Sequence, residues 1–187
     1  MKKFIFGYGS LINLESAGRT LQRPLTREEV YTVTLNGYTR CWNLFDDVFS
    51  EIMNEEVKAV FLNIANSENS NINGIILPVN ELELSEFKTR EKNYDCVDVT
   101  KLIKITDERS PKKKYRVYTF VGKASCLTEN INNHYFVFQK YINIVERGVN
   151  SFTSDFTSEF HKTTMPLSFE ILQGDYKFID AKQQKAR

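Results

Sequence analysis

A glycine-containing loop near the start of the chain combines residue types that can bind an anionic group. Gly7 and Gly9 flank a tyrosine, and Ser10 and Leu11 follow, directly after the apolar run Phe4–Phe6. Backbone N–H groups that small residues leave accessible at the end of a strand form a concave array, which binds a carboxylate or a developing oxyanion. The alternative is a plain structural turn, and the loop alone does not decide between the two.

Three other functions of glycine loops are excluded. The dinucleotide-binding fingerprint G-x-G-x-x-G needs a third glycine where this chain has Ile12. A Walker loop needs a lysine after its second glycine, and none is present. A nucleophile elbow needs glycines two residues before and two residues after its serine, and Ser10 has neither.

The second candidate for chemistry is a single carboxylate, Glu91, within the stretch KTREKNYDCVDV. A buried carboxylate can take a proton from one substrate group and deliver it to another. The alternative interpretation is that Arg90, Glu91 and Lys92 form a charged patch in solvent, which is the commoner role of such triplets. Glu91 is therefore a candidate base only if the fold buries it.

Composition narrows the classes of partner and cofactor. The 187 residues carry a net charge of +1, so neither a nucleic acid nor an anionic membrane is expected as a partner. Three scattered cysteines form no CxxC pair, which argues against a disulfide framework or a zinc site. No metal or cofactor is expected, and His134 and His161 are interpreted as structural or surface residues.

No membrane segment or leader is expected either. No run approaches ~18 apolar residues, the length that a transmembrane helix needs. The stretch after Lys2 and Lys3 is interpreted as a buried first strand rather than a signal peptide, because glycines interrupt it and no cleavage pattern follows. The expected location is the cytoplasm.

Periodicity and turn residues predict strands and helices without a regular βαβ repeat, which indicates a mixed α/β (α+β) class in one domain over residues 1–179. Strands are predicted at Phe4–Phe6, Val30–Leu35, Val57–Ile64, Gly74–Val79, Val97–Ile105 and Tyr115–Val121. Helices are predicted at Asn13–Leu21, Glu81–Asn93, Asn133–Arg147 (ended by Gly148) and Ser151–Lys162. A turn is predicted at Asn36–Gly37, a surface loop at Ser67–Asn73 and a frayed tail over residues 180–187.

Five segments resemble the γ-glutamylcyclotransferase-like family in the same order, most closely its ChaC-type and plant-type (AIG2-like) members. They are FGYGSLIN, ESAGRTL, LNGYTRCWN, TREKNYDCVDV and YINIVERG, which span roughly residues 4 to 148. The family loop, YGS plus an apolar residue, corresponds to Tyr8–Leu11, and the setting R-E-x-x-Y of its catalytic glutamate corresponds to Arg90–Tyr94. A late tyrosine seven residues before a glycine corresponds to Tyr141 and Gly148.

The resemblance implies a γ-glutamyl cyclotransferase. In that reaction the α-amine of a γ-glutamyl group attacks its own γ-carbonyl, and 5-oxoproline and an amine are released. The nucleophile belongs to the substrate, so the resemblance implies a metal-independent enzyme in which Glu91 is the catalytic acid and base. The implied substrate-binding residues are Phe6, Gly7, Tyr8, Gly9, Ser10, Leu11, Tyr141, Tyr94 and Arg40.

Two of those positions have alternative interpretations. Tyr94 can line the site or simply pack in the core, and Arg40 can pair with a carboxylate anywhere in the fold.

The implied fold is a small closed mixed β-sheet or barrel with helices packed outside. The family often has a proline-serine pair shortly before the late tyrosine, where this chain has Phe136–Gln139. That departure bears on the pocket for the leaving group.

Several functional alternatives stay open at this point. The substrate can be glutathione, a γ-glutamyl amino acid or a γ-glutamyl amine, and the assembly a monomer or a weak homodimer. A non-catalytic small-molecule binder on the same fold is a second class, although a binder would need the loop but not Glu91. A third class, an unrelated β-rich interaction module, would make both motifs coincidental.

Overall fold

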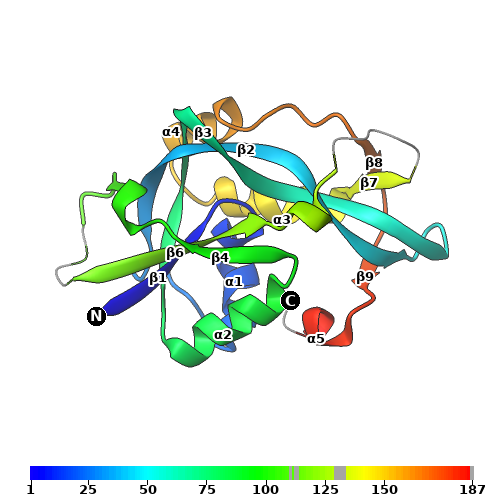
Figure 1. The fold of residues 1–187 in the computed structure, drawn as a ribbon, viewed down its shortest axis with the longest axis horizontal. Coiled ribbons are helices and arrows are strands. Elements are labelled where there is room, and N and C mark those ends of the chain that lie inside the picture. Colours follow the sequence, from blue (N-terminus) through cyan, green and yellow to red (C-terminus); the bar gives the residue numbers. More distant parts are fainter. Residues whose placement is uncertain (110, 112–113, 129–133, 186–187) are drawn as a thin grey trace.

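Two long strands rich in β-branched and aromatic residues form the centre of the fold in the computed structural model, which describes residues 1–109, 111, 114–128 and 134–185. Strands β2 (Tyr31–Ser50) and β3 (Glu55–Val79) pair antiparallel along nearly their whole length. Both strands cross the molecule and bend as they do so (Figure 1). The two ends of this hairpin therefore reach different parts of the sheet.

The remaining strands attach to the two halves of this hairpin. β1 (Lys2–Gly7) lies between β3 and β6 (Tyr115–Gly122), antiparallel to the first and parallel to the second, and β4 (Tyr94–Asp98) pairs with β6. At the other half, β7 (Tyr135–Phe138) lies between β3 and β8 (Glu170–Leu172). β2 also pairs with the short strands β5 (Ile103–Ile105) and β9 (Tyr176–Phe178).

This arrangement confirms the mixed α+β class with a mixed sheet. The main path of strands is β4-β6-β1-β3-β2-β5. Within the described ranges no ladder joins β4 to β5, and the chain connects them through the 3-10 turn η2 (Thr100–Leu102). Helices lie outside the sheet, as expected (Figure 1).

The helices begin at residues that cap them. Asn13 accepts a hydrogen bond from the Ser16 N–H at the start of α1 (Leu14–Leu21), and Asn80 forms a capping box with Glu83 at the start of α2 (Glu81–Arg90). The other elements are η1 (Ser10–Ile12), η3 (Ala124–Cys126), α3 (Gln139–Val149), α4 (Ser154–Lys162) and α5 (Ala181–Lys185). The predicted helices over Asn13–Leu21, Glu81–Asn93 and Ser151–Lys162 are confirmed, with shorter bounds.

Gly148 lies inside α3 instead of ending it. A Cβ on Gly148 would lie 2.5 Å from the backbone nitrogen of Asn13. Only glycine therefore lets α3 pack this closely against the end of the glycine-containing loop.

Two predicted interruptions of the hairpin are wrong. Asn36–Gly37 is a β-bulge within β2, where Gly37 has a φ of +79°, and not a turn. Ser67–Asn73 lies inside β3 and not in a surface loop, with a register shift between the pairs Asn36–Asn71 and Tyr38–Asn66. Residues Asn71–Asn73 of this polar segment pair with β2, and residues 67–70 lie at the register shift, although the composition of the whole segment is that of a loop.

Two other predicted elements are wrong in part. Val97–Ile105 is not one strand, because β4 ends at Asp98, whose carboxylate accepts hydrogen bonds from Thr100 and turns the chain toward β2. The helix predicted from Asn133 begins only at Gln139, after strand β7, and Asn133 itself lies outside the described residues. The apolar run YFVF is compatible with a buried strand or a buried helix, and its period does not distinguish them.

The structure differs from the predicted frayed tail over residues 180–185. Gln183 in α5 is 1% exposed and donates a 2.7 Å hydrogen bond to the carboxylate of Asp46. Gln184 accepts a 2.7 Å hydrogen bond from the Phe178 N–H. The segment lacks large apolar side chains, so its attachment through glutamine amides was not visible in its hydropathy. Residues 186–187 lie outside the described part.

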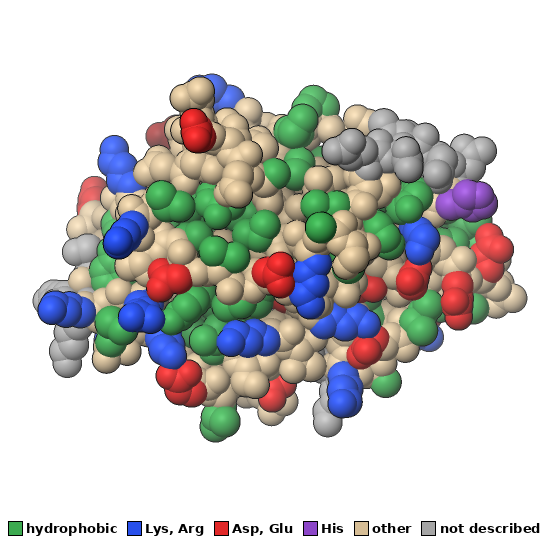
Figure 2. All heavy atoms as spheres, in the orientation of Figure 1, with side chains coloured by type: hydrophobic (Ala, Val, Ile, Leu, Met, Phe, Trp, Pro, Cys, Tyr) green, Lys and Arg blue, Asp and Glu red, His purple; other side chains and the backbone are tan. Residues whose placement is uncertain are grey.

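The surface charges reflect the near-zero net charge of the chain. On the face shown in Figure 2, basic and acidic side chains are intermixed. In the described part of the chain, no helix has the length and apolar character needed to cross a membrane.

Candidate active site

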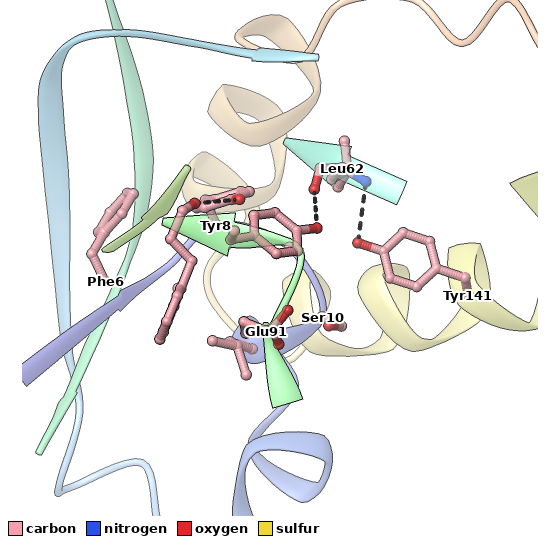
Figure 3. Close-up of a pocket in the computed structure, with 11 residues that line it drawn as sticks. Phe6, Tyr8, Ser10, Leu62, Glu91 and Tyr141 are labelled. Atoms are coloured by element: carbon pink, nitrogen blue, oxygen red, sulfur yellow. Dashed lines mark hydrogen bonds between the residues drawn. The ribbon is translucent and has the colours of Figure 1, made fainter. Parts of the chain in front are cut away.

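The glycine-containing loop, the junction of α2 with β4, and helix α3 surround one small pocket. Its empty volume is about 310 Å³, which includes space open to solvent. Figure 3 shows Glu91 beside Ser10, with Tyr8 and Tyr141 on opposite sides of them in this view. The lining residues are Phe6, Gly7, Tyr8, Gly9, Ser10, Leu11, Leu62, Glu91, Tyr94, Phe120 and Tyr141.

The loop has the compact geometry that its glycines allow. Gly9 caps η1, and its carbonyl accepts a 2.9 Å hydrogen bond from the Ile12 N–H. The first N–H groups of a helix have no partner within the helix, and a glycine cap offers no side chain to supply one. No side chain caps η1, and Gly9, Ser10 and Leu11 all line the pocket.

The space around the two loop glycines leaves little room for a side chain. A Cβ on Gly9 would lie 3.1 Å from the hydroxyl of Tyr141 and 3.5 Å from the Cβ of Leu62. A Cβ on Gly7 would lie 2.8 Å from the Cβ of Leu11. Side chains at these positions would press on the pocket wall.

Glu91 is buried at the point where α2 ends and the chain turns into β4. Only 7% of its surface is exposed. Its N–H donates to the Phe87 carbonyl at 2.8 Å, and its own carbonyl accepts from the Tyr94 N–H at 2.9 Å. This tight turn brings both Glu91 and Tyr94 to the pocket. The alternative of a solvated charged patch is therefore wrong for Glu91.

Arg90 connects the candidate base to the loop. It is 1% exposed, and its Nε lies 2.8 Å from the Glu91 carboxylate. Its Nη2 donates to the hydroxyls of Ser10 (3.0 Å) and Ser16 (3.2 Å), and its Nη1 donates to the Ser16 carbonyl (3.0 Å) and to Thr20 (2.7 Å). One guanidinium thus fixes Glu91, the loop and helix α1 relative to one another.

Two tyrosines, one in β4 and one in α3, bond the backbone of the same β3 residue, Leu62. Tyr94 in β4 donates to the Leu62 carbonyl at 3.0 Å, and the Tyr141 hydroxyl in α3 accepts from the Leu62 N–H at 3.4 Å, as the dashed lines in Figure 3 show. Both hydroxyls lie at the pocket wall, where a ligand can exchange with the Leu62 contacts. Tyr94 therefore lines the site and does not merely pack in the core.

Tyr8 closes one side of the pocket as a neutral group. Its hydroxyl donates a 2.7 Å hydrogen bond to the Phe120 carbonyl. Burial, and then the nearby carboxylate of Glu91, raise the pKa of Tyr8 well above its ordinary value. The ring of Tyr8 forms part of the pocket wall beside the loop.

Arg40 does not line the pocket, in contrast to the substrate-binding role expected for it. It is fully buried, its guanidinium carbon lies 3.9 Å from the ring centre of Phe160, and it donates to the carbonyls of Phe160 and Asn73 and to the hydroxyl of Thr164. Burial lowers the pKa of Arg40 to about 9. Its neutral partners tie β2 to α4 and β3, which is a structural role.

The remaining reactive residue types lie outside the pocket. His134 and His161 are exposed, and His161 lies 3.4 Å from Glu146. All three cysteines are free, and burial raises the pKa of Cys41 to about 11. Among the residues that the structure describes, no three His, Cys, Asp or Glu side chains are grouped in a way that could hold a metal ion.

The sequence reasoning missed Leu62 and Phe120 in the pocket wall and the linking contacts of Arg90. Leu62 and Phe120 come from the middle of apolar strands, where nothing distinguishes a pocket residue from a core residue. The signal for Arg90 was present, since an arginine directly beside a buried glutamate is a ready partner for it.

The sequence itself matches no protein-family model and no curated protein. Several solved structures resemble this fold. YkqA from Bacillus subtilis has a TM-score of 0.58 at 16% identity, covering 86% of this chain and 53% of its own, so the chain spans about half the length of YkqA. A γ-glutamyl cyclotransferase has a TM-score of 0.58 at 13% identity, covering 90% of this chain and 91% of its own.

The third structure is a γ-glutamyl cyclotransferase specific to glutathione, from yeast. Its TM-score is 0.55 at 9% identity, with 87% of this chain and 97% of the yeast chain covered. Identities this low compare folds and not activities. The chain therefore has the γ-glutamyl cyclotransferase-like fold, as its five-segment resemblance implied.

Proposed function

We propose that the protein is a γ-glutamyl cyclotransferase that releases 5-oxoproline from a γ-glutamyl amide. The observation that carries the proposal is the position of Glu91, a buried carboxylate that lines the same pocket as the glycine-containing loop. A protein that only bound a small molecule would need the loop but would not need an acid-base group in its pocket. The solved cyclotransferases with this fold support the same assignment.

Each requirement of the reaction has a group in the pocket. The α-ammonium of the substrate has to lose a proton before its nitrogen can attack the γ-carbon, and Glu91 accepts that proton. The nitrogen then bonds to the γ-carbon and gives up a second proton, and the bond from that carbon to the leaving nitrogen breaks. Both protons pass through Glu91 to the leaving nitrogen, which departs as an ammonium group. No covalent bond to the enzyme is formed.

Backbone groups of the loop would bind the substrate and stabilise the negative charge that develops during the reaction. N–H groups between Gly7 and Leu11 can hold the α-carboxylate of the substrate and the oxygen that becomes negative in the tetrahedral intermediate. Holding the flexible γ-glutamyl chain in its ring-forming geometry can be worth an effective molarity on the order of 10⁵ M or more. The Tyr94 and Tyr141 hydroxyls offer further contacts.

The direct test is to incubate the purified protein with glutathione, γ-glutamyl amino acids and γ-glutamyl amines and to measure 5-oxoproline. We expect turnover of at least one class, and activity that survives exhaustive chelation of metals. Binding of a γ-glutamyl compound without any 5-oxoproline would favour the non-catalytic binder instead. Absence of both binding and turnover would reject the pocket as a γ-glutamyl site.

Gly9→Ala is expected to weaken binding of a γ-glutamyl ligand by about tenfold while the protein unfolds within a few degrees of wild type. The added Cβ meets the Tyr141 hydroxyl and the Leu62 side chain, so it narrows the pocket without forcing an unfavourable φ. Ser10→Ala should have a smaller effect, because its backbone N–H remains. Thermal unfolding and calorimetric titration of both variants test this, and normal binding by Gly9→Ala would make the loop a structural turn.

A further inference from the structure

Two asparagine-glycine pairs occur in the sequence, Asn36–Gly37 in β2 and Asn73–Gly74 in β3. In such a pair, no side chain on the glycine obstructs the approach of its backbone nitrogen to the asparagine side chain. The asparagine amide can then react with that nitrogen and lose ammonia. The surroundings of each pair in the folded protein decide whether this reaction has room to occur.

The pair Asn36–Gly37 lies at an open position of the sheet. The Asn36 side chain is exposed, and a Cβ on Gly37 would have no described atom within 4 Å beyond those of its chain neighbours. The β2–β3 register skips Gly37, which has a φ of +79° at the bulge. The Asn36 amide donates a solvent-exposed 3.2 Å hydrogen bond to the Leu102 carbonyl. Local opening at this bulge therefore breaks few contacts.

The pair Asn73–Gly74 lies in the interior of the same hairpin. Asn73 is 7% exposed, its Nδ2 donates to the Phe156 carbonyl at 2.7 Å, and Arg40 donates to its backbone carbonyl. A Cβ on Gly74 would lie only 2.5 Å from the Gly7 carbonyl oxygen. Asn73 and Gly74 both pair with β2. The same reaction at Asn73 would therefore require this part of the sheet to open first.

We infer that Asn36 is a site of spontaneous deamidation in the folded protein and that the fold protects Asn73 from it. The Gly37 backbone nitrogen bonds to Cγ of Asn36, and the bond from Cγ to Nδ2 breaks. The proton of the Gly37 nitrogen passes through solvent to Nδ2, which leaves as ammonia. Water then adds to one of the two carbonyl carbons of the cyclic imide and opens it to aspartate or isoaspartate. The product carries a new negative charge and no longer donates to Leu102.

Peptide mapping by mass spectrometry tests the inference without any assay of activity. The folded protein is aged in warm, mildly alkaline buffer and digested with trypsin. Asn36 is the only asparagine of the tryptic peptide 28–40, and fragment ions locate Asn73 within the peptide 59–88. We expect deamidation at Asn36 to be at least about tenfold faster than at Asn73, because Asn73 reacts only after local opening. Equal rates at the two sites, whether fast or slow, would overturn the inference.

Two controls identify the fold as the source of the difference. In protein unfolded by urea, both asparagine-glycine pairs should react at similar rates, and a preference for Asn36 that persisted there would overturn the structural explanation. Asn36→Gln keeps an amide but would need a six-membered ring, so the aged variant should lose most of its labelling by a carboxyl methyltransferase specific for isoaspartate. Undiminished labelling of Asn36→Gln would place the reaction at another asparagine and overturn the assignment to Asn36.

Discussion

Glu91→Gln is expected to lower the rate of 5-oxoproline formation by ~10² or more, the usual contribution of a general acid-base group. The amide keeps the size of the side chain but cannot accept the proton of the α-ammonium. Binding of the γ-glutamyl substrate should survive, because the loop and the two tyrosine hydroxyls are unchanged. The loss should therefore fall on kcat rather than on KM, measured at saturating substrate.

The same helix offers a matched control for this variant. Glu86 is exposed in α2, so Glu86→Gln makes an identical chemical change outside the pocket and should leave kcat unchanged. If Glu91→Gln turned over substrate at nearly the wild-type rate, Glu91 would have no part in the mechanism. The pocket would then be a binding site whose acid is supplied elsewhere.

Local sequence signals predicted the parts of the site that each lie within a few consecutive residues. The stretch Tyr8–Leu11 marked a candidate loop, and the resemblance to the family setting R-E-x-x-Y marked the turn from Arg90 to Tyr94 that carries Glu91. Both depend on short-range geometry, since a glycine pair after a strand and a helix end followed by a strand are set by neighbouring residues. The identification of Tyr141 came from the resemblance and not from the pattern of its own helix.

The site predictions that failed concern residues whose positions depend on contacts between distant segments of the chain. Leu62 lies in the pocket wall because Tyr94 and Tyr141, 32 and 79 residues away, bond its carbonyl and its N–H respectively. Arg40 lies outside the pocket, where its guanidinium donates to the backbone carbonyls of Asn73 and Phe160. Neither outcome is encoded in the residues next to Leu62 or Arg40 in the sequence.

The failures in secondary structure have a similar cause. The polar run Ser67–Asn73 lacks the composition of a strand, yet β3 continues through it, and its last three residues pair with β2. The C-terminal helix α5 lacks an apolar face, and it is attached by the amide of Gln183 to Asp46, 137 residues away. Hydropathy and propensity describe local preference, so they miss elements that are stabilised by remote polar partners.

Arg90→Met is expected to destabilise the fold by about 3–5 kcal/mol, the typical cost of removing one partner of a buried ion pair. The substitution leaves the Glu91 carboxylate without its 2.8 Å partner and removes the bonds to Ser10, Ser16 and Thr20. Urea unfolding followed by the fluorescence of Trp42, the only tryptophan, measures this loss. Lys88→Met, at an exposed position of the same helix, should change stability by no more than about 0.5 kcal/mol.

A double variant separates the loss of the ion pair from the loss of the other contacts. In Arg90→Met/Glu91→Gln no unpaired carboxylate remains, so we expect it to be more stable than Arg90→Met by roughly 1–2 kcal/mol, within the usual range of coupling between touching residues. Strictly additive effects would mean that Arg90 stabilises only the loop and α1, and that Glu91 does not depend on it. A smaller loss of stability from Arg90→Met in the Glu91→Gln background than in wild type would support the inference that the guanidinium holds Glu91 in the pocket. The cost of Arg90→Met would then depend on the charge of Glu91.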